Sequence, residues 1–339
     1  MSSASVTLAE VARHAGVSQS TVSYVISGKR SISDTTRRRV ERSIATLGYR
    51  PHAGARALAS RRANTIALMV PLREELHLPV MMEFVVAVVT SARRFDHDVL
   101  LLTSAEGPAG VRRVANTSLV DGLVVMDVAM RDERIPALLE IGRPSVLIGM
   151  PETTVGLTCV DLDFFAAGAA CVEHLAELGH DRIALIGPAP EVYRRGAGFA
   201  ERTLAGFESR ARQRGLHASH HACDAARDDV GRLVSELLGA AEPPTGFVVH
   251  NEAAHALLLE ALRGTGHSVP ADVSVVAICP DAMADQARPR LSSVHLPAEE
   301  LGRRAVETLM HKLDGDAAIG ATLLPPVLTA RESSAPRAV

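Results

Sequence analysis

The chain has 339 residues, of which 47% are hydrophobic and 22% charged, and its formal net charge at pH 7 is −3. This length predicts two or three domains with sizeable cores, and the composition is that of an ordinary soluble protein. The N-terminus lacks the basic start and apolar run of a signal peptide, and no stretch offers the ~18 uninterrupted apolar residues needed to cross a bilayer. We therefore expect a cytoplasmic protein without a membrane partner.

The charge is divided unevenly along the chain. Residues 1–62 contain eleven Lys or Arg against three Asp or Glu, a net charge of +8, so the remainder carries −11. A basic head on an acidic body predicts a polyanion partner for the head only. The cysteines lie far apart without metal-ligand spacing, so we expect reduced, buried thiols and neither a metal nor a cofactor. They are Cys159, Cys171, Cys223 and Cys279.

Three helices are predicted in the basic head. In "VTLAEVARHAG", Thr7 and Glu10 have the spacing of a capping box at the start of a helix with one apolar stripe. Gly16 supplies a turn, and Ser18 is positioned to cap a second helix. Ser33 is positioned to cap a third, through "DTTRRRVERSIATLG". Two short helices joined by a tight turn and followed by a third predict a helix-turn-helix domain over residues 1–50.

The second helix, within "AGVSQSTVSYVI", has an exposed side without any charge, formed by Gln19, Ser20, Ser23 and Tyr24. A solvated helix face usually carries charged pairs, whereas short neutral donors and acceptors suit the base edges of DNA. The alternative is a polar helix in an ordinary three-helix bundle. The capping pattern and the charge of the head favour a recognition helix.

The segment "VTLAEVARHAGVSQSTVSYVISGKRSISDTTRRRVERSIATLGYRPHAGARALAS" resembles the N-terminal region of the LacI/GalR family of bacterial transcription regulators. The stretches "VDLDFFAAGAACVEHLAELGHDRIALIG", "VPADVSVVAI" and "PRLSSVHLPAEELGRRAVETL" fall where the family has its characteristic effector-domain segments. The resemblance implies a homodimeric repressor that binds double-stranded, pseudo-palindromic operator DNA. The residues expected to contact DNA are Thr7, Leu8, Ser18, Gln19, Ser20, Ser23, Tyr24, Ser27, Ser33, Thr36, Tyr49, His52, Ala55, Arg56 and Leu58.

Residues 51–63 are interpreted as a linker that orders on DNA. Pro51 can start a short helix, but Gly54 costs about 1 kcal/mol in a helix interior, and so short a helix is marginal alone in water. The resemblance implies a hinge helix, paired across a dimer, that inserts Leu58 into the minor groove. His52 stands where the family more often has Asn, which weakens that contact. A flexible linker with an incidental leucine is the alternative.

From Thr65 to residue 335, short apolar runs alternate with helical segments. Apolar strands alternating with helices predict parallel sheets covered on both faces, and the span is too long for one such sheet. The resemblance implies an α/β effector domain of two doubly wound, periplasmic-binding-protein-like lobes behind the all-α head, with three crossings between lobes. The boundaries expected are residues 64–160 and 292–323 for the first lobe, and 161–290 and 324–335 for the second.

A small-molecule effector is expected between the lobes, and several departures from the family pattern argue against a simple sugar. Asn251 is retained but Glu252 replaces an Asp, "AICP" replaces two carboxylates, and Thr203 stands where sugar-responsive members often have Arg, with Arg202 adjacent. Fewer carboxylates and guanidinium donors suit a polyol poorly. The expected lining residues are Leu78, Met81, Arg202, Thr203, His250, Asn251 and Cys279.

Other functions are less well supported. Cys279, His250 and Asn251 suggest a thiol enzyme, but nothing in the sequence orients the imidazole toward the thiol, and catalytic signatures are absent, so we expect no catalytic residues. A free-standing solute receptor would share the body's fold, yet the basic head argues against it. A vestigial pocket, with regulation by a protein partner or by none, stays open.

Overall fold

A computed structural model describes residues 6–27, 32–49, 62–73, 75–117, 119–316 and 320–337. The head consists of α1 (Leu8–Ala15), α2 (Gln19–Ser27) and α3 (Asp34–Leu47). These helices pack around a small core that includes Val11, Val22 and Val40, each of them fully buried. The expected helix-turn-helix is therefore present.

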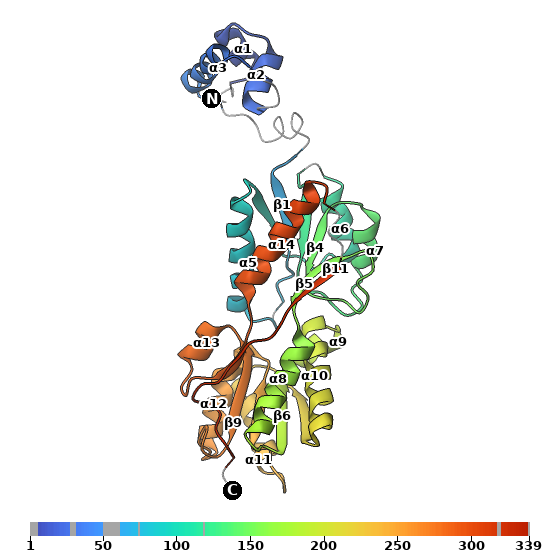
Figure 1. Cartoon of the computed structure of the whole chain (residues 1–339), viewed down its shortest axis with the longest axis vertical. Helices are drawn as coiled ribbons and strands as arrows, with labels where there is room; N and C mark the ends of the chain where they lie inside the picture. The colour runs from blue at the N-terminus through green and yellow to red at the C-terminus, as the bar shows by residue number, and fades with distance from the viewer. Residues whose placement is uncertain are drawn as a thin grey trace.

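The first lobe is a six-stranded parallel sheet in the order β11-β5-β4-β3-β1-β2. Alternate residues of each strand face opposite sides, so Ile66 and Leu68 pack with α5 and α14, while Ala67 and Met69 pack with α6 and α7. The helices thus cover both faces (Figure 1). The elements are β1 (Thr65–Met69), α5 (Leu78–Arg93), β2 (Asp98–Leu102), α6 (Gly107–Ala115), β3 (Gly122–Val125), α7 (Ile135–Glu140), β4 (Ser145–Ile148), β5 (Thr158–Leu162), α14 (Ala298–Leu313) and β11 (Gly320–Leu324).

The second lobe repeats this plan in the order β12-β10-β9-β8-β6-β7, with only the β10–β12 pair antiparallel. Its elements are α8 (Phe164–Glu177), β6 (Arg182–Gly187), α9 (Pro190–Arg194), α10 (Gly198–Arg214), β7 (His217–Ala222), α11 (Arg227–Leu238), β8 (Gly246–Val249), the 3-10 turn η1 (Glu252–Ala254), α12 (His255–Gly264), β9 (Ser274–Cys279), α13 (Asp281–Gln286), β10 (Ser292–His295) and β12 (Leu328–Thr329). Two α/β lobes were expected, and this fold class is confirmed. None of the helices in the described part of the chain is both long and apolar enough to span a membrane.

Three segments connect the lobes, after β5, after β10 and after β11 (Figure 1). Three expected boundaries need correction. The first lobe keeps all of β5 to Leu162, and residues 292–295 belong to the second lobe because β10 pairs with β9 there. Ser292 and Ser293 are buried in that sheet although they are polar, so no apolar run marks this strand in the sequence, and the boundary that the resemblance implies falls before it. Leu324 likewise belongs to the first lobe, as the last residue of β11.

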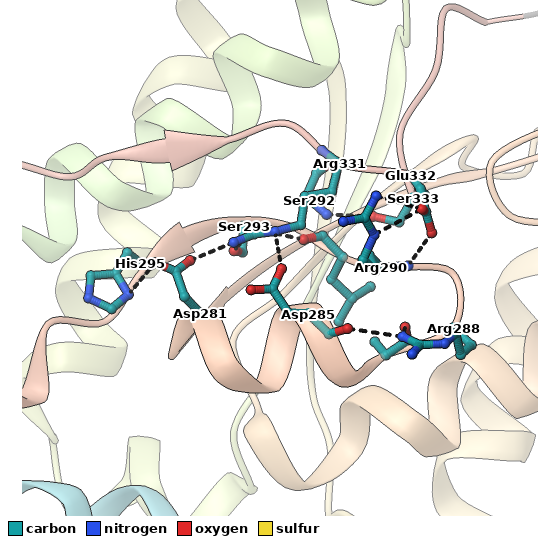
Figure 2. A network of polar contacts seen from close by, with 12 residues as sticks. Asp281, Asp285, Arg288, Arg290, Ser292, Ser293, His295, Arg331, Glu332 and Ser333 are labelled. Carbon is teal, nitrogen blue, oxygen red and sulfur yellow. Dashed lines mark hydrogen bonds and ion pairs between the residues drawn. The ribbon is translucent and has the colours of Figure 1, made fainter.

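The segment after β12 is fastened to the second lobe by Arg331, whose guanidinium is largely buried (Figure 2). Its Nε donates to Asp285 and its Nη2 to Asp281, both at 2.8 Å, and Nη1 donates to the Ser293 hydroxyl at 2.7 Å. The other Asp281 oxygen lies 3.2 Å from Nδ1 of His295, at the end of β10. Two of the three inter-lobe segments are therefore anchored at their second-lobe ends by one polar network.

Candidate functional site

The turn between α1 and α2 is built as its sequence predicts. The Thr7 amide donates to the Glu10 carboxylate at 2.7 Å, and the Glu10 amide donates back to the Thr7 hydroxyl at 3.3 Å. Gly16 ends α1 at φ 61°, a conformation that favours glycine. The Thr21 amide donates to the Ser18 hydroxyl at 3.2 Å, which caps α2. These contacts set the direction in which α2 leaves the turn.

The uncharged side of α2 is accessible to a partner. Ser18, Gln19 and Ser20 are exposed, and Ser23 and Tyr24 are half-buried beside the buried Val22. Arginines at positions 37, 38, 39 and 42 are exposed on α3. Short neutral groups suit contact with base edges, and exposed arginines elsewhere in the same domain suit contact with phosphates.

The other residues expected to contact DNA differ in how exposed they are to solvent. Thr7 and Ser33 are exposed, Leu8 and Thr36 are half-buried, and the Ser33 hydroxyl accepts from the Thr36 amide at 3.4 Å. Tyr49 is only 6% exposed and packs in the head's core, so its ring has a structural role there. His52, Ala55, Arg56, Leu58, most of the expected hinge and the Ser27 side chain lie outside the described residues.

A cavity lies between the two lobes, with a volume of about 110 Å³. It receives side chains from α5, from the ends of β3, β4 and β5, from the starts of α8 and α10, and from η1. This is the edge at which parallel strands end, where α/β proteins bind their ligands. The lining residues are Leu76, His77, Val80, Met81, Phe84, Met126, Asp127, Val128, Ile148, Gly149, Asp161, Phe164, Phe199, His250, Glu252 and Leu296.

His250 is held between two aromatic rings of the cavity wall. Its ring centroid lies 5.5 Å from that of Phe164, nearly parallel at 22°, and 5.4 Å from that of Phe199 at 75°. The side chain is 3% exposed, and burial lowers the pKa of His250 to about 3. The imidazole is therefore neutral at physiological pH.

Three carboxyl groups also line the cavity. Asp127 accepts from Arg73 of the first lobe at 3.0 Å and from Arg195 of the second at 2.6 Å. Burial raises the pKa of Asp161 to about 8 and that of Glu252 to about 7. Asp127 thus links the two lobes through its contacts with both arginines, whereas with these pKa values Asp161 is largely protonated and Glu252 about half protonated at neutral pH.

The lobes also touch along one rim of the cavity through backbone groups. The Met130 amide donates to the Gly196 carbonyl at 2.7 Å, and the Gly198 amide donates to the Val128 carbonyl at 2.9 Å. A Cβ on Gly198 would lie 2.9 Å from the Met150 carbonyl oxygen, so this approach needs glycine. Arg202 adds bonds to the carbonyls of Met150, at 3.3 Å, and Pro151, at 2.8 Å.

Of the seven expected effector residues, Met81 and His250 line the cavity and five do not. Leu78 is 52% exposed, and Arg202 is engaged at the rim. The Thr203 hydroxyl donates to the Phe199 carbonyl within α10. Asn251 donates to the carbonyls of Gly187 and Cys223, and Cys279 is fully buried in the second lobe's core.

Sequence reasoning missed Asp127, Asp161, Phe164 and Phe199, and it named Glu252 only as a departure from the family pattern. The three acids follow or end apolar strands, and this position was the available signal. Among the described residues, no group of three His, Cys, Asp or Glu side chains is arranged to hold a metal ion.

Two family models match the chain. Residues 7–52 match the bacterial regulatory proteins of the lacI family, and residues 172–334 match the periplasmic binding protein-like domain. The HTH-type transcriptional regulator CelR of Thermobifida fusca is 32% identical over an alignment of 340 positions, which covers 91% of this chain and 92% of that protein.

Solved structures agree with these matches. The Lac repressor dimer bound to operator and the anti-inducer ONPF has a TM-score of 0.84 at 25% identity, over 98% of this chain and 100% of that one. A CelR–cellobiose complex has a TM-score of 0.67 at 28% identity, over 97% and 100% of the two chains. This chain therefore belongs to the LacI family: it is a DNA-binding transcriptional regulator with a periplasmic-binding-protein-like effector domain, and not an enzyme.

Proposed function

We propose that the protein is a repressor that binds a pseudo-palindromic operator as a homodimer, with an affinity set by an effector between its lobes. One helix-turn-helix reads only a few base pairs, so a two-fold pair of heads matches an inverted repeat. The observation that carries this proposal is the exposed, uncharged side of α2 in the same chain as an inter-lobe cavity. The similar Lac repressor is a dimer on its operator, which supports the stoichiometry.

A surface suited to a second copy lies on α5. Leu78, Met82, Val86 and Val89 follow helical spacing and are 52%, 40%, 54% and 38% exposed. A contiguous apolar stripe of this kind marks an interaction surface. Val86→Glu would place charges in that interface, so we expect it to produce monomers in sedimentation experiments. A dimer that persists in this variant would exclude α5 from the interface.

Within each half-site, Gln19, Ser20 and Tyr24 are proposed to read bases. Leu58 is proposed to wedge into the minor groove at the operator centre, where an apolar side chain unstacks and bends DNA. Leu58→Ala should weaken operator binding and reduce bending without changing the thermal stability of the protein. If the variant binds and bends operator like the parent, the hinge assignment is wrong.

The effector is proposed to differ from the simple sugars. The cavity walls are formed mainly by aliphatic and aromatic side chains, so only a few carboxyl and imidazole groups are left to pair with the many hydroxyls of a polyol. A structure of CelR has been solved with cellobiose, so this proposal predicts that the two regulators bind different effectors.

The proposed function is tested by selecting bound sequences from random DNA with the purified full-length protein. We expect inverted repeats, bound with a stoichiometry of two chains for each site. Enrichment of a single unrepeated half-site would contradict the dimeric mode. No enrichment at low salt would contradict sequence-specific DNA binding by this chain.

A further inference from the structure

The ionisable side chains of the cavity are unevenly matched, with more acids than bases. Among the described residues that line it are three carboxyl groups and two imidazoles, but no Lys or Arg side chain. Asp127 is already compensated, since Arg73 and Arg195 both donate to it. Asp161 and Glu252 form no ion pair with any residue in the described ranges. Two carboxyls of the cavity therefore have no cationic partner among the residues that the structure describes.

The hydrogen bonds around these carboxyls leave room for a ligand. Asp161 accepts from the Leu162 amide at 3.0 Å. The nearby guanidinium of Arg202 is turned to the carbonyls of Met150 and Pro151 and does not pair with Asp161. Glu252 is the first residue of η1, on the opposite lobe from Asp161. One bound group that contacted both carboxylates would join the two lobes.

The rest of the wall is apolar or neutral. Phe164 and Phe199 contact His250, whose imidazole makes no hydrogen bond within the described structure and whose Nδ1 is buried. The volume of about 110 Å³ approaches the roughly 150 Å³ of an engineered apolar cavity that binds benzene. A compact body, of the size of one six-membered ring, is therefore the best match to the cavity.

We propose that the effector is a small organic cation, a protonated amine on a compact apolar or aromatic body. This inference rests on the function proposed above for the same cavity. The ammonium group would face Asp161 and Glu252, and the apolar body would lie against Phe164, Phe199 and Met81. Anions are disfavoured because none of the described residues that line the cavity is Lys or Arg, and a cation beside an aromatic face gains a further attraction.

The protonation of the carboxyls gives this proposal a distinct signature. Burial holds the pKa of Asp161 at about 8 and that of Glu252 at about 7, and a bound ammonium would favour the ionised forms. Binding should therefore release protons, and affinity should rise with pH from about 6 to 8.5. The titratable groups that face them are Cys159, Asp163 and Arg202 around Asp161, and Glu83 and Cys279 around Glu252.

The test uses four probes on the full-length protein: benzylamine, its neutral analogue benzyl alcohol, the anion benzoate, and cellobiose. We expect calorimetry at pH 8 to give an affinity for benzylamine at least tenfold above that for benzyl alcohol, with no binding of benzoate. Proton release should appear as a dependence of the heat on the buffer used. Equal affinity for benzylamine and benzyl alcohol, or tighter binding of cellobiose, would overturn the proposal.

Variants locate the interaction. Glu252→Gln and Asp161→Asn should each reduce benzylamine affinity at least tenfold and leave benzyl alcohol affinity within threefold. Glu299→Gln, on an exposed residue of α14, is the matched control and should change neither. Unchanged benzylamine affinity in both cavity variants would refute the assignment even if benzylamine binds.

Operator binding is measured separately by fluorescence anisotropy. Benzylamine binding without an effect on operator affinity would support the ligand class and contradict the regulatory role of the cavity. Intact operator binding without benzylamine binding would contradict the ligand class and leave the proposed DNA-binding function standing.

Discussion

The head and the inter-lobe cavity use polar side chains in opposite ways. On α2 they are short, uncharged and accessible, and they lie within six consecutive positions from Gln19 to Tyr24. In the cavity, Asp161 and His250 are buried and Glu252 is half-buried, and the pKa values of all three are displaced by burial. DNA can approach an exposed surface, whereas a small ligand must be enclosed to be recognised. The head can therefore be read from local sequence, and the cavity only from the fold.

The largest expected effect comes from a substitution that unfolds the head and leaves the two-lobed body folded. Val22 is fully buried in the head's core, so Val22→Asp would place an unpaired charge there, at a cost of several kcal/mol. We expect operator affinity to fall more than a hundredfold while the body's thermal unfolding stays unchanged. Anisotropy and calorimetry on the same sample check both results. A lowered transition temperature for the body would show that the two regions are not independent.

The converse change targets the second lobe. A Cβ on Gly206 of α10 would lie 1.9 Å from the Phe165 carbonyl oxygen at the start of α8, so Gly206→Ala must force these helices apart. We expect a loss of about 3 kcal/mol in the body's free energy of unfolding, measured by denaturant titration. Gly231→Ala in α11 is the control, because its Cβ would meet nothing within 4 Å. That change should stabilise the body by up to about 1 kcal/mol.

The sequence predicts the buried strands well and the exposed or polar ones poorly. The run "TIALMVP" contains β1, and "VSVVAIC" contains β9, because continuous apolar residues are needed where helices cover both faces. The edge strand β7, "HASHHA", has no apolar run, since its first three residues are exposed. The strand β10 is buried with serines whose hydroxyls are hydrogen-bonded to Arg331 and Ser334, which lie about 40 residues away.

The cavity was predicted least well for the same physical reason. Asn251 and Cys279 do lie beside strand ends, but their side chains turn into the second lobe, toward backbone carbonyls and the core. Phe164 and Phe199 begin two different helices, and their rings pack against each other, with centroids 6.0 Å apart, and against His250. No local pattern marks such a meeting. The capping residues of the head, by contrast, act within three positions of each other.

Tyr24→Arg tests whether the uncharged side of α2 reads bases. The resemblance to the family implies Arg at this position in many members, and Arg binds guanine bidentately, whereas a phenol offers one donor and one acceptor. We expect the preferred base at one position of each half-site to change, by about 1 to 3 kcal/mol. Selection from random DNA measures this preference. A uniform change in affinity with the same preferred bases would assign Tyr24 to phosphate contact or packing.

The smallest expected effect concerns the cost of burying Glu252. Its pKa is raised by burial from 4.5 to about 7, so the folded state holds a proton that the unfolded state has released between pH 4.5 and 7. The stability of the parent protein should therefore fall as pH rises through this window and then level off. Glu252→Gln keeps the group neutral and removes this loss. We expect the variant to match the parent near pH 4.5 and to exceed it by about 1 to 2 kcal/mol at pH 8, which corresponds to a few degrees in Tm. This is less than the full pKa difference would give, because Glu252 is half-buried and solvent screens part of the effect. Thermal unfolding of both proteins from pH 4.5 to 8.5, without ligand, gives the difference. A constant difference in stability between variant and parent across that range would mean that Glu252 is already ionised in the folded protein. The head and the cavity would then differ in where their polar groups lie, but burial would not change the protonation of this carboxyl.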